Sequence, residues 1–332
     1  MGAGTLQRLK LLYLVKIFEY DTDENHPLSA PEICKRLAEL GISAERKSIY
    51  EDIEALCLYG YDIIKTRSPK SGYFLGARDF ETPEVYLLED AVRTAKFISA
   101  KKTRELVAKL DGMLSRYQSR RLTDGIYIDS EGKCKNEEIF YTIDRIQCAI
   151  ENRHKIILKY GVRMLGNDNS IITDVKERKI SPYAMTWQDD HYYLIGNYEK
   201  YDNLIHLRID RMRSVTETNE SIRHFSQVSK YDSFFDTADY TKRLFSMFGG
   251  DTERVEFRCD KSILEQVADR FGDNIFITRV TDTHFCFSAD VTVSQALVTH
   301  ILNYGSKMEV LSPPSLKKMI VERAGEVLEL YS

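Results

Sequence analysis

The stretch ISAERKSIYEDIEALCLYG, residues 42–60, decides the fold class of the first part of the chain. Ile49, Ile53 and Leu56 recur at the spacing of one helical face, and Gly60 follows as a stop signal. The pattern predicts a helix with Ser43 as its N-cap. The stretch has more acidic than basic side chains: Glu45, Glu51, Asp52 and Glu54 against Arg46 and Lys47.

Two further helices are predicted upstream of this stretch. Residues 6–20 are densely apolar at helical spacing, and residues 29–40 begin with the N-cap signal of Ser29 followed by Glu32. Gly41 ends the second helix and leaves only a tight turn before the third. Two short helices joined in this way form a helix-turn-helix, whose second helix presents its N-terminal residues to the major groove.

A basic hairpin is predicted directly after the third helix, over residues 61–76. Such a hairpin can touch phosphates beside the groove as a wing. Another interpretation remains open, since a helix-turn-helix serves many interactions and hairpin charges are often only solvated. The side chains predicted to lie at DNA are Arg46, Lys47, Ser48, Tyr50, Lys65, Arg67 and Lys70.

The run GISAERKSIYEDIEALCLYGYDIIK and the hairpin up to Leu75 resemble the winged helix of DeoR-type bacterial regulators. In that family a small residue, a basic residue, a hydroxyl and an aromatic-Xaa-Asp-Ile/Leu run occupy the recognition helix. The chain departs from the family at Glu51, where Arg is common. The resemblance therefore implies DNA recognition with one phosphate or base contact missing.

Composition restricts the function classes. The 332 residues carry a net charge of −4, which excludes the large cationic excess of proteins that coat nucleic acid. The absence of an apolar run of membrane length or of a signal peptide predicts a cytoplasmic protein. Cysteines fall singly, and the sequence has no HExxH, GxSxG, Walker-type or GxGxxG motif. We therefore expect no enzyme, no metal and no cofactor.

Helical periodicity continues over residues 82–100, 103–122 and 136–153, with an extended or loop segment at 123–133. Thr82 is the predicted cap of the first of these helices, and Pro83 lies in its first turn. Their apolar stripes can pack on a neighbouring domain or on a second copy. We predict a homodimer, because paired helix-turn-helices read half-sites one helical turn apart.

From Lys155 the apolar period changes to two. Residues 155–161, 173–187, 190–200 and 203–217 read as strands of a small barrel of about five strands. In the last run His206, Arg208 and Asp210 share one face, opposite the core residues Leu207 and Ile209. That polar face is either a site or plain solvent-exposed surface, with Asp210 and Arg211 as a local ion pair.

The stretch ISPYAMTWQDDHYYLIGNYEKYDNLIHLRIDRM, residues 180–212, resembles the WYL domain of bacterial regulators. The motif stands here as Tyr192-Tyr193-Leu194, with Tyr in place of Trp, and is followed by Arg208-Ile209-Asp210-Arg211. The resemblance implies an Sm-like barrel that senses a nucleotide or nucleic-acid ligand. Guanidinium groups bind phosphate and an aromatic ring stacks on a base. The resemblance assigns the ligand to Tyr193, Arg208 and Arg211, and we add Tyr183 and His206 on geometry.

The C-terminal 80 or so residues read as strand, helix, strand, strand, helix, strand, helix, which is the order of a ferredoxin-like domain with a terminal helix. Ser294 is the predicted N-cap of the second helix. The segment resembles the WCX extension that follows WYL domains. We expect no catalytic site in it, and assign His284 and His300 structural or surface roles.

The predicted organisation is a multidomain α+β protein. Residues 1–80 form a winged helix-turn-helix, 81–153 a helical linker, 154–228 a WYL barrel, 229–250 a connector and 251–332 a WCX domain. The predicted function is a bacterial transcriptional regulator with double-stranded DNA and a nucleotide or oligonucleotide effector as partners. The alternative is a nucleic-acid-binding accessory protein, for instance in defence, whose barrel grips single strands without operator recognition.

Overall fold

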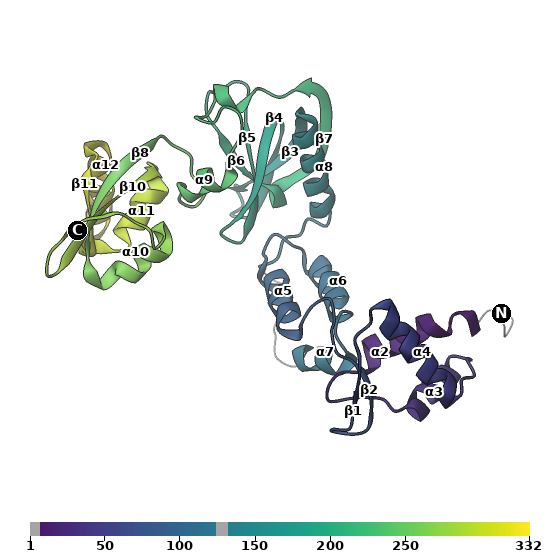
Figure 1. The fold of residues 1–332 in the computed structure, drawn as a ribbon. Helices are drawn as coiled ribbons and strands as arrows, with labels where there is room; N and C mark the ends of the chain where they lie inside the picture. The colour runs from purple at the N-terminus through teal and green to yellow at the C-terminus, as the bar shows by residue number, and fades with distance from the viewer. Residues whose placement is uncertain (1–6, 124–131) are drawn as a thin grey trace. The chain divides into compact units, whose positions relative to one another are not determined.

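The computed structural model describes residues 7–123 and 132–332. Contacts divide the chain into two compact units, residues 1–137 and 138–332. Each unit is described by itself (Figure 1). The predicted loop at 123–133 lies almost wholly outside the described residues.

The first unit begins with three helices and a hairpin. These are α2 (Lys10–Asp21), α3 (Ala30–Glu39), α4 (Arg46–Tyr59), β1 (Ile63–Thr66) and β2 (Gly72–Leu75). Leu14, Ile33, Leu37 and Ile49 are fully buried in their shared core. The helices thus pack through the apolar faces that the sequence marks.

The start of α4 differs from the prediction. The helix begins at Arg46 with Glu45 as N-cap, so the expectation that Ser43 caps it is wrong. Ile42 is buried instead, and its N–H donates to the carbonyl of Leu37 at 2.9 Å. This bond keeps the turn extended after Gly41, whose φ of 78° only glycine adopts readily.

Three more helices complete the first unit: α5 (Thr82–Thr94), α6 (Ala100–Asp111) and α7 (Arg116–Thr123). The helix predicted over 103–122 is broken at Gly112, and the cap of α5 is Glu81 instead of Thr82. The break lets Ser115 donate a 2.6 Å hydrogen bond to the buried Asp23 carboxylate. This bond joins the linker segment to the loop after α2.

The second unit opens with α8 (Ile139–Asn152), which packs on a five-stranded sheet of order β6-β5-β4-β3-β7 (Figure 1). Ile146 and Ala149 of the helix are fully buried against it. The strands are β3 (His154–Leu165), β4 (Ile171–Gln188), β5 (His191–Asn197), β6 (Ile205–Arg208) and β7 (Met212–Ser221). Neighbouring strands pair antiparallel.

The single strand predicted over 203–217 is two strands. A short 3-10 turn, η1 (Ile209–Arg211), separates β6 from β7. Leu207 and Ile209 are buried as expected. The turn changes the direction of Asp210 and Arg211, so the two-residue alternation fails there.

A connector follows the sheet, with η2 (Phe225–Gln227) and α9 (Thr237–Lys242). Phe235, Leu244 and Met247 of the connector pack on Ile195 of β5. Ser246 and Met247 adopt positive φ angles of 47° and 57°, which non-glycine residues rarely do. Tertiary contacts, and not local preference, therefore fix this end of the connector.

The last domain has the element order that the sequence predicts: β8 (Thr252–Asp260), η3 (Lys261–Ile263) with α10 (Leu264–Phe271), β9 (Ile277–Val280), β10 (His284–Thr292), α11 (Gln295–Leu302), η4 (Gly305–Lys307), β11 (Met308–Ser312) and α12 (Pro314–Tyr331). Its antiparallel sheet has the order β11-β8-β10-β9. Ser294 caps α11 by accepting the Leu297 N–H, as predicted. Of the described helices, none is long and apolar enough to cross a membrane.

Candidate functional site

The second unit holds a hollow between the β5–β6 edge of the sheet and the connector, with a volume of about 1150 Å³. Four cationic side chains line it, against two carboxylates: Arg208, Arg211, Lys230 and Arg243 against Asp202 and Asp251. Aromatic rings line it as well: Tyr160, Tyr193, Tyr198, Tyr231, Tyr240 and Phe248. Cations among aromatic rings suit an anionic ligand with a flat group.

Arg208 stands at the end of β6, where η1 turns Asp210 back toward it. Its Nε and Nη2 donate to the two Asp210 carboxylate oxygens at 3.0 and 2.7 Å. Burial lowers the pKa of this guanidinium, but the Asp210 carboxylate outweighs burial and raises the pKa. Asp210 therefore holds Arg208 in a fixed fork.

Tyr193 and Arg211 line the hollow beside Arg208, as predicted. Tyr193 is paired with Arg208 across β5 and β6, so both side chains lie on one face. Burial raises the pKa of Tyr193, and the charges of Arg208 and Arg211 partly oppose this. No ion pair between Arg211 and a carboxylate is seen in the described part of the chain, which leaves its guanidinium available to a ligand.

The connector adds cations that the sequence did not single out. Asp239 of α9 receives Arg243 Nη2 at 2.6 Å, Lys230 Nζ at 3.2 Å and the Tyr231 hydroxyl at 2.6 Å. These residues lie in a segment of mixed composition without strand or motif signal. Only their approach to β6 brings them to the site.

His206 lines the hollow but has structural partners. Its Nε2 lies 2.9 Å from the Tyr240 hydroxyl, and the rings stack with centroids 5.7 Å apart. Burial lowers the pKa of His206 to about 4, although a hydrogen bond with the Met247 backbone opposes the shift. The neutral ring thus ties the connector to β6.

Tyr183, the fifth predicted ligand residue, does not line the hollow. It is buried, its hydroxyl donates to the Arg223 carbonyl at 2.8 Å, and its ring packs on Phe225 and Phe235. The geometric argument for Tyr183 is corrected, because the bulge of β4 at Pro182–Ala184 turns this residue toward the connector core.

The predicted DNA-facing residues divide into two groups. Arg46, Lys47 and Arg67 are exposed, and no ion pair with another described residue is seen for them. The others are partly engaged. Ser48 Oγ accepts a hydrogen bond from Lys10 Nζ at 2.5 Å, and Lys70 pairs with Glu32 at 2.8 Å. Lys65 lies over the Tyr73 ring, and the half-exposed ring of Tyr50 lies near the same Tyr73 ring.

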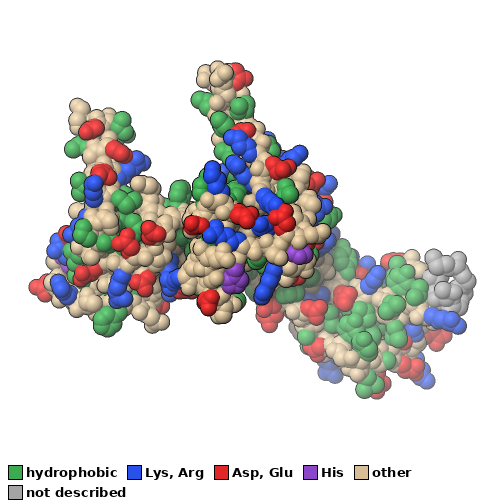
Figure 2. Space-filling model, turned by 90° about the horizontal axis from the view of Figure 1, so that it is seen from above, with side chains coloured by type: hydrophobic (Ala, Val, Ile, Leu, Met, Phe, Trp, Pro, Cys, Tyr) green, Lys and Arg blue, Asp and Glu red, His purple; other side chains and the backbone are tan. Residues whose placement is uncertain are grey.

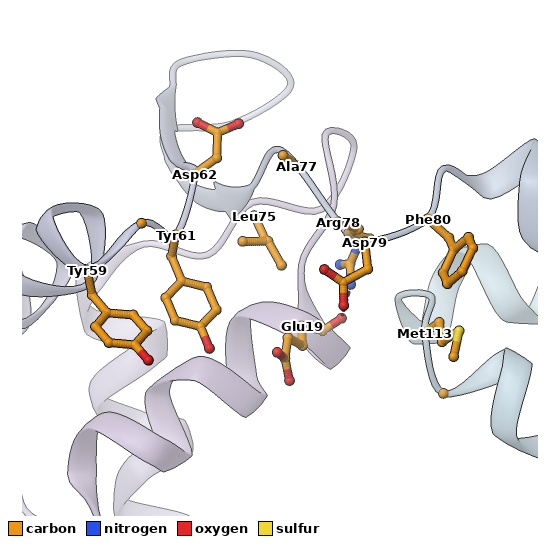
Figure 3. A pocket seen from close by; sticks show the side chains of 12 residues that line it. Glu19, Tyr59, Tyr61, Asp62, Leu75, Ala77, Arg78, Asp79, Phe80 and Met113 are labelled. Atoms are coloured by element: carbon orange, nitrogen blue, oxygen red, sulfur yellow. Dashed lines mark hydrogen bonds between the residues drawn. The ribbon is translucent and has the colours of Figure 1, made fainter.

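A hollow in the first unit has the opposite character (Figure 3). Glu19, Asp62 and Asp79 line it with the stacked rings of Tyr59 and Tyr61. Its one arginine, Arg78, donates to the backbone carbonyls of Glu19 and Thr22 at 2.7 and 2.8 Å. Three carboxylates make this hollow unsuitable for phosphate, so the cationic hollow is the candidate ligand site.

Comparison with protein families identifies two domains. Residues 141–217 match the WYL domain and residues 251–328 match the WCX domain. The resemblances inferred from the sequence for these two segments are therefore confirmed. The WYL match includes α8 and most of the sheet, and so contains Tyr193, His206, Arg208 and Arg211.

Two solved structures are similar to the chain. Proteasome accessory factor B/C (PafBC) of Arthrobacter aurescens is 14% identical with a TM-score of 0.28; the match covers 94% of this chain and 47% of that one, so the chain spans about half its length. A CRISPR Cas-related protein is 12% identical with a TM-score of 0.37, covering 99% of this chain and 85% of that one. No curated protein matches the chain.

Proposed function

We propose that the protein is a ligand-responsive transcriptional regulator that binds double-stranded DNA as a homodimer. The observation that carries the proposal is a WYL domain with a cationic, aromatic hollow in the same chain as helices α3 and α4, of which α4 begins with the exposed Arg46 and Lys47. Arg46 and Lys47 would contact the DNA, and the proposed DNA-binding domain that presents them is a DeoR-type winged helix.

The proposed effector is a nucleotide or a short oligonucleotide. Arg211 and the fork of Arg208 would receive phosphate, while Tyr193 would stack on a base. Lys230 and Arg243 would extend the site onto the connector. No catalytic step, metal or cofactor is part of the proposal. Ligand binding would act by changing the placement of the two DNA-binding units and their fit to half-site spacing.

A second candidate function is an accessory protein that grips single-stranded nucleic acid through the WYL domain. Two contacts favour it: Ser48 is hydrogen-bonded to Lys10, and Lys70 is paired with Glu32. Both leave fewer free side chains at the predicted DNA face. In that case the helix-turn-helix would serve as a protein-interaction module.

The experiment that separates the two is binding of the full chain to labelled duplex from the region upstream of its own gene. Single-stranded DNA and RNA of equal length are the competitors, over a salt series. Duplex binding that is lost in Arg46→Ala with Lys47→Ala supports the regulator. The matched control, Lys317→Ala with Lys318→Ala, removes equal charge from the exposed start of α12.

Preference for single strands, lost in Arg211→Ala but retained in Arg213→Ala, would instead favour the accessory protein. Arg213 is an exposed β7 arginine outside the hollow. Arg211 is the better choice than Arg208, since removal of Arg208 also leaves the Asp210 carboxylate without its partner.

A further inference from the structure

Strands β3 and β4 continue beyond the sheet as a two-stranded arm, residues 161–180. β7 pairs with β3 only as far as Tyr160, and β5 pairs with β4 only from Ser181 onward. Between these points the described strands pair only with each other, from Gly161 with Val175 to Leu165 with Ile171. The arm therefore has two open edges.

The arm carries exposed apolar side chains among its charged ones. Ile156, Leu158 and Ile180 form the buried face of the sheet, and Val162, Met164 and Ile172 continue that face into the arm, where they are about half exposed. At the tip Leu165 and Ile171 are 71% and 75% exposed. In Figure 2 hydrophobic side chains lie beside charged ones on a projection from this part of the chain. An open edge with exposed apolar side chains is able to pair with another strand.

The hydrogen-bond pattern shows which backbone groups are open. Gly166 N–H donates to Ser170 O at 2.8 Å across the turn. Bonded and non-bonded pairs alternate along an antiparallel ladder, and the pairing has no bulge here. Residues 164/172 and 162/174 are therefore bonded pairs, and 161/175 is a non-bonded pair. In a non-bonded pair the N–H and C=O point away from the partner strand. Val175 therefore directs its N–H and C=O away from β3, to the open edge.

We infer that this edge is occupied by the β4 edge of a second copy, antiparallel about a two-fold axis at Val175. Only registers that bring outward-pointing residues opposite each other can form a ladder. An axis at Asp174 would oppose two aspartates, and one at Lys176 two lysines. The axis at Val175 places Asp174 opposite Lys176 of the second copy, and Lys176 opposite its Asp174.

Other side chains fit the same register. Val175 meets its own counterpart, while Ile171 and Ile172 lie against the aliphatic stems of Lys179 and Arg178 of the second copy. The existing pair of Lys176 with Asp174, at 2.9 Å, becomes part of a group of four alternating charges. The contact deepens the homodimer of the proposed function, but it uses neither the ligand hollow nor the DNA-facing residues.

The test is the mass of the full chain by sedimentation equilibrium, for Asp174→Lys and Lys176→Asp separately and mixed. Each variant alone opposes like charges twice, so the dissociation constant of its dimer should be roughly tenfold higher than that of the original chain. The equimolar mixture should restore the dimer, because a chain with two lysines then faces a chain with two aspartates.

Three further variants complete the design. Asp174→Lys with Lys176→Asp in one chain should dimerise like the original, and Lys318→Asp outside the arm should too. Val175→Pro removes an N–H that only the second copy uses, so it should weaken the dimer while the unfolding midpoint stays within the range of the other variants.

Two results overturn the inference. One is a dimer whose dissociation constant in both single reversals is unchanged from that of the original chain, which would locate the contact elsewhere. The other is a monomer at every concentration. A monomer that still binds duplex through Arg46 and Lys47 would remove the arm contact and leave the DNA-binding proposal intact.

Discussion

At the scale of single residues, carboxylates decide which cations of the hollow are available. Asp210 holds Arg208 in a fork, and Asp239 holds both Arg243 and Lys230. Since each pair must be loosened or shared when a phosphate enters, the carboxylates set the affinity for an anion as much as the cations do.

The first residue-scale prediction concerns Asp239→Asn. The amide can still accept the Tyr231 hydroxyl bond, but it no longer neutralises Arg243 and Lys230. A 5′-phosphorylated single-stranded oligonucleotide should bind about fivefold more tightly, equivalent to ~1 kcal/mol, as measured by fluorescence anisotropy. Asp232→Asn, an exposed site outside the hollow, is the matched control. Equal affinities for the two variants would contradict the assigned role of Asp239.

The second residue-scale prediction follows from the pKa of His206, about 4 in the folded chain against 6.5 for the ordinary group. The unfolded chain binds more protons between these values, so stability falls as the pH drops from about 6.5 toward 4. The loss is up to about 3 kcal/mol. Urea unfolding at pH 7 and pH 5 should show a smaller difference for His206→Gln than for the original.

The control for this pH dependence is His224→Gln, at an exposed ring. His300 has a pKa lowered by burial and contributes in the same direction, so the slope is reduced and not abolished. An unchanged slope in His206→Gln would mean that the ring is not held neutral by its buried position.

At the scale of elements, helix caps show where local sequence is sufficient. Ser29 and Glu32 form the capping box that their spacing predicts, because both partners belong to one turn. Ser43 was also predicted as an N-cap, but Arg46 and not Glu follows three residues later, and α4 starts at Arg46. There the bond from Ile42 N–H to the Leu37 carbonyl holds the chain extended, and a tertiary contact overrides the cap.

The element-scale prediction is a pair of substitutions. Ser29→Ala should lower the free energy of unfolding of the first unit by about 1 kcal/mol, through loss of the N-cap. Ser43→Ala should leave it within about 0.5 kcal/mol, since Ser43 caps no helix. Chemical denaturation of the full chain, followed by circular dichroism, measures both. Equal losses would mean that Ser43 does cap α4 in solution.

At the scale of the whole molecule, the proposed regulator links two binding events in different units. If ligand changes duplex affinity by some factor, duplex must change ligand affinity by the same factor. We expect the two ratios to agree when the phosphorylated oligonucleotide and the upstream duplex are titrated in either order. The control is the affinity of the variant Arg46→Ala with Lys47→Ala for the oligonucleotide alone. An unchanged affinity excludes binding of the oligonucleotide to the DNA-facing residues. Two ratios of one would contradict coupling between the units.

The order of elements in the last domain, and the presence of two domains in the second unit, could be predicted from the sequence alone. Period-two patterns and N-cap signals are local, so Leu207, Ile209, Ser29 and Ser294 have the predicted roles. The resemblance to the WYL domain likewise indicated Tyr193, Arg208 and Arg211, which line the hollow.

How those side chains are used depends on tertiary contacts. The η1 turn pairs Asp210 with Arg208, a bulge in β4 removes Tyr183 from the hollow, and the connector adds Arg243. Each outcome depends on contacts between segments far apart in sequence or on one irregular residue. A periodic pattern predicts neither. The open edges of the arm could not be predicted either, because the sequence of β3 and β4 does not show where the neighbouring strands β7 and β5 end.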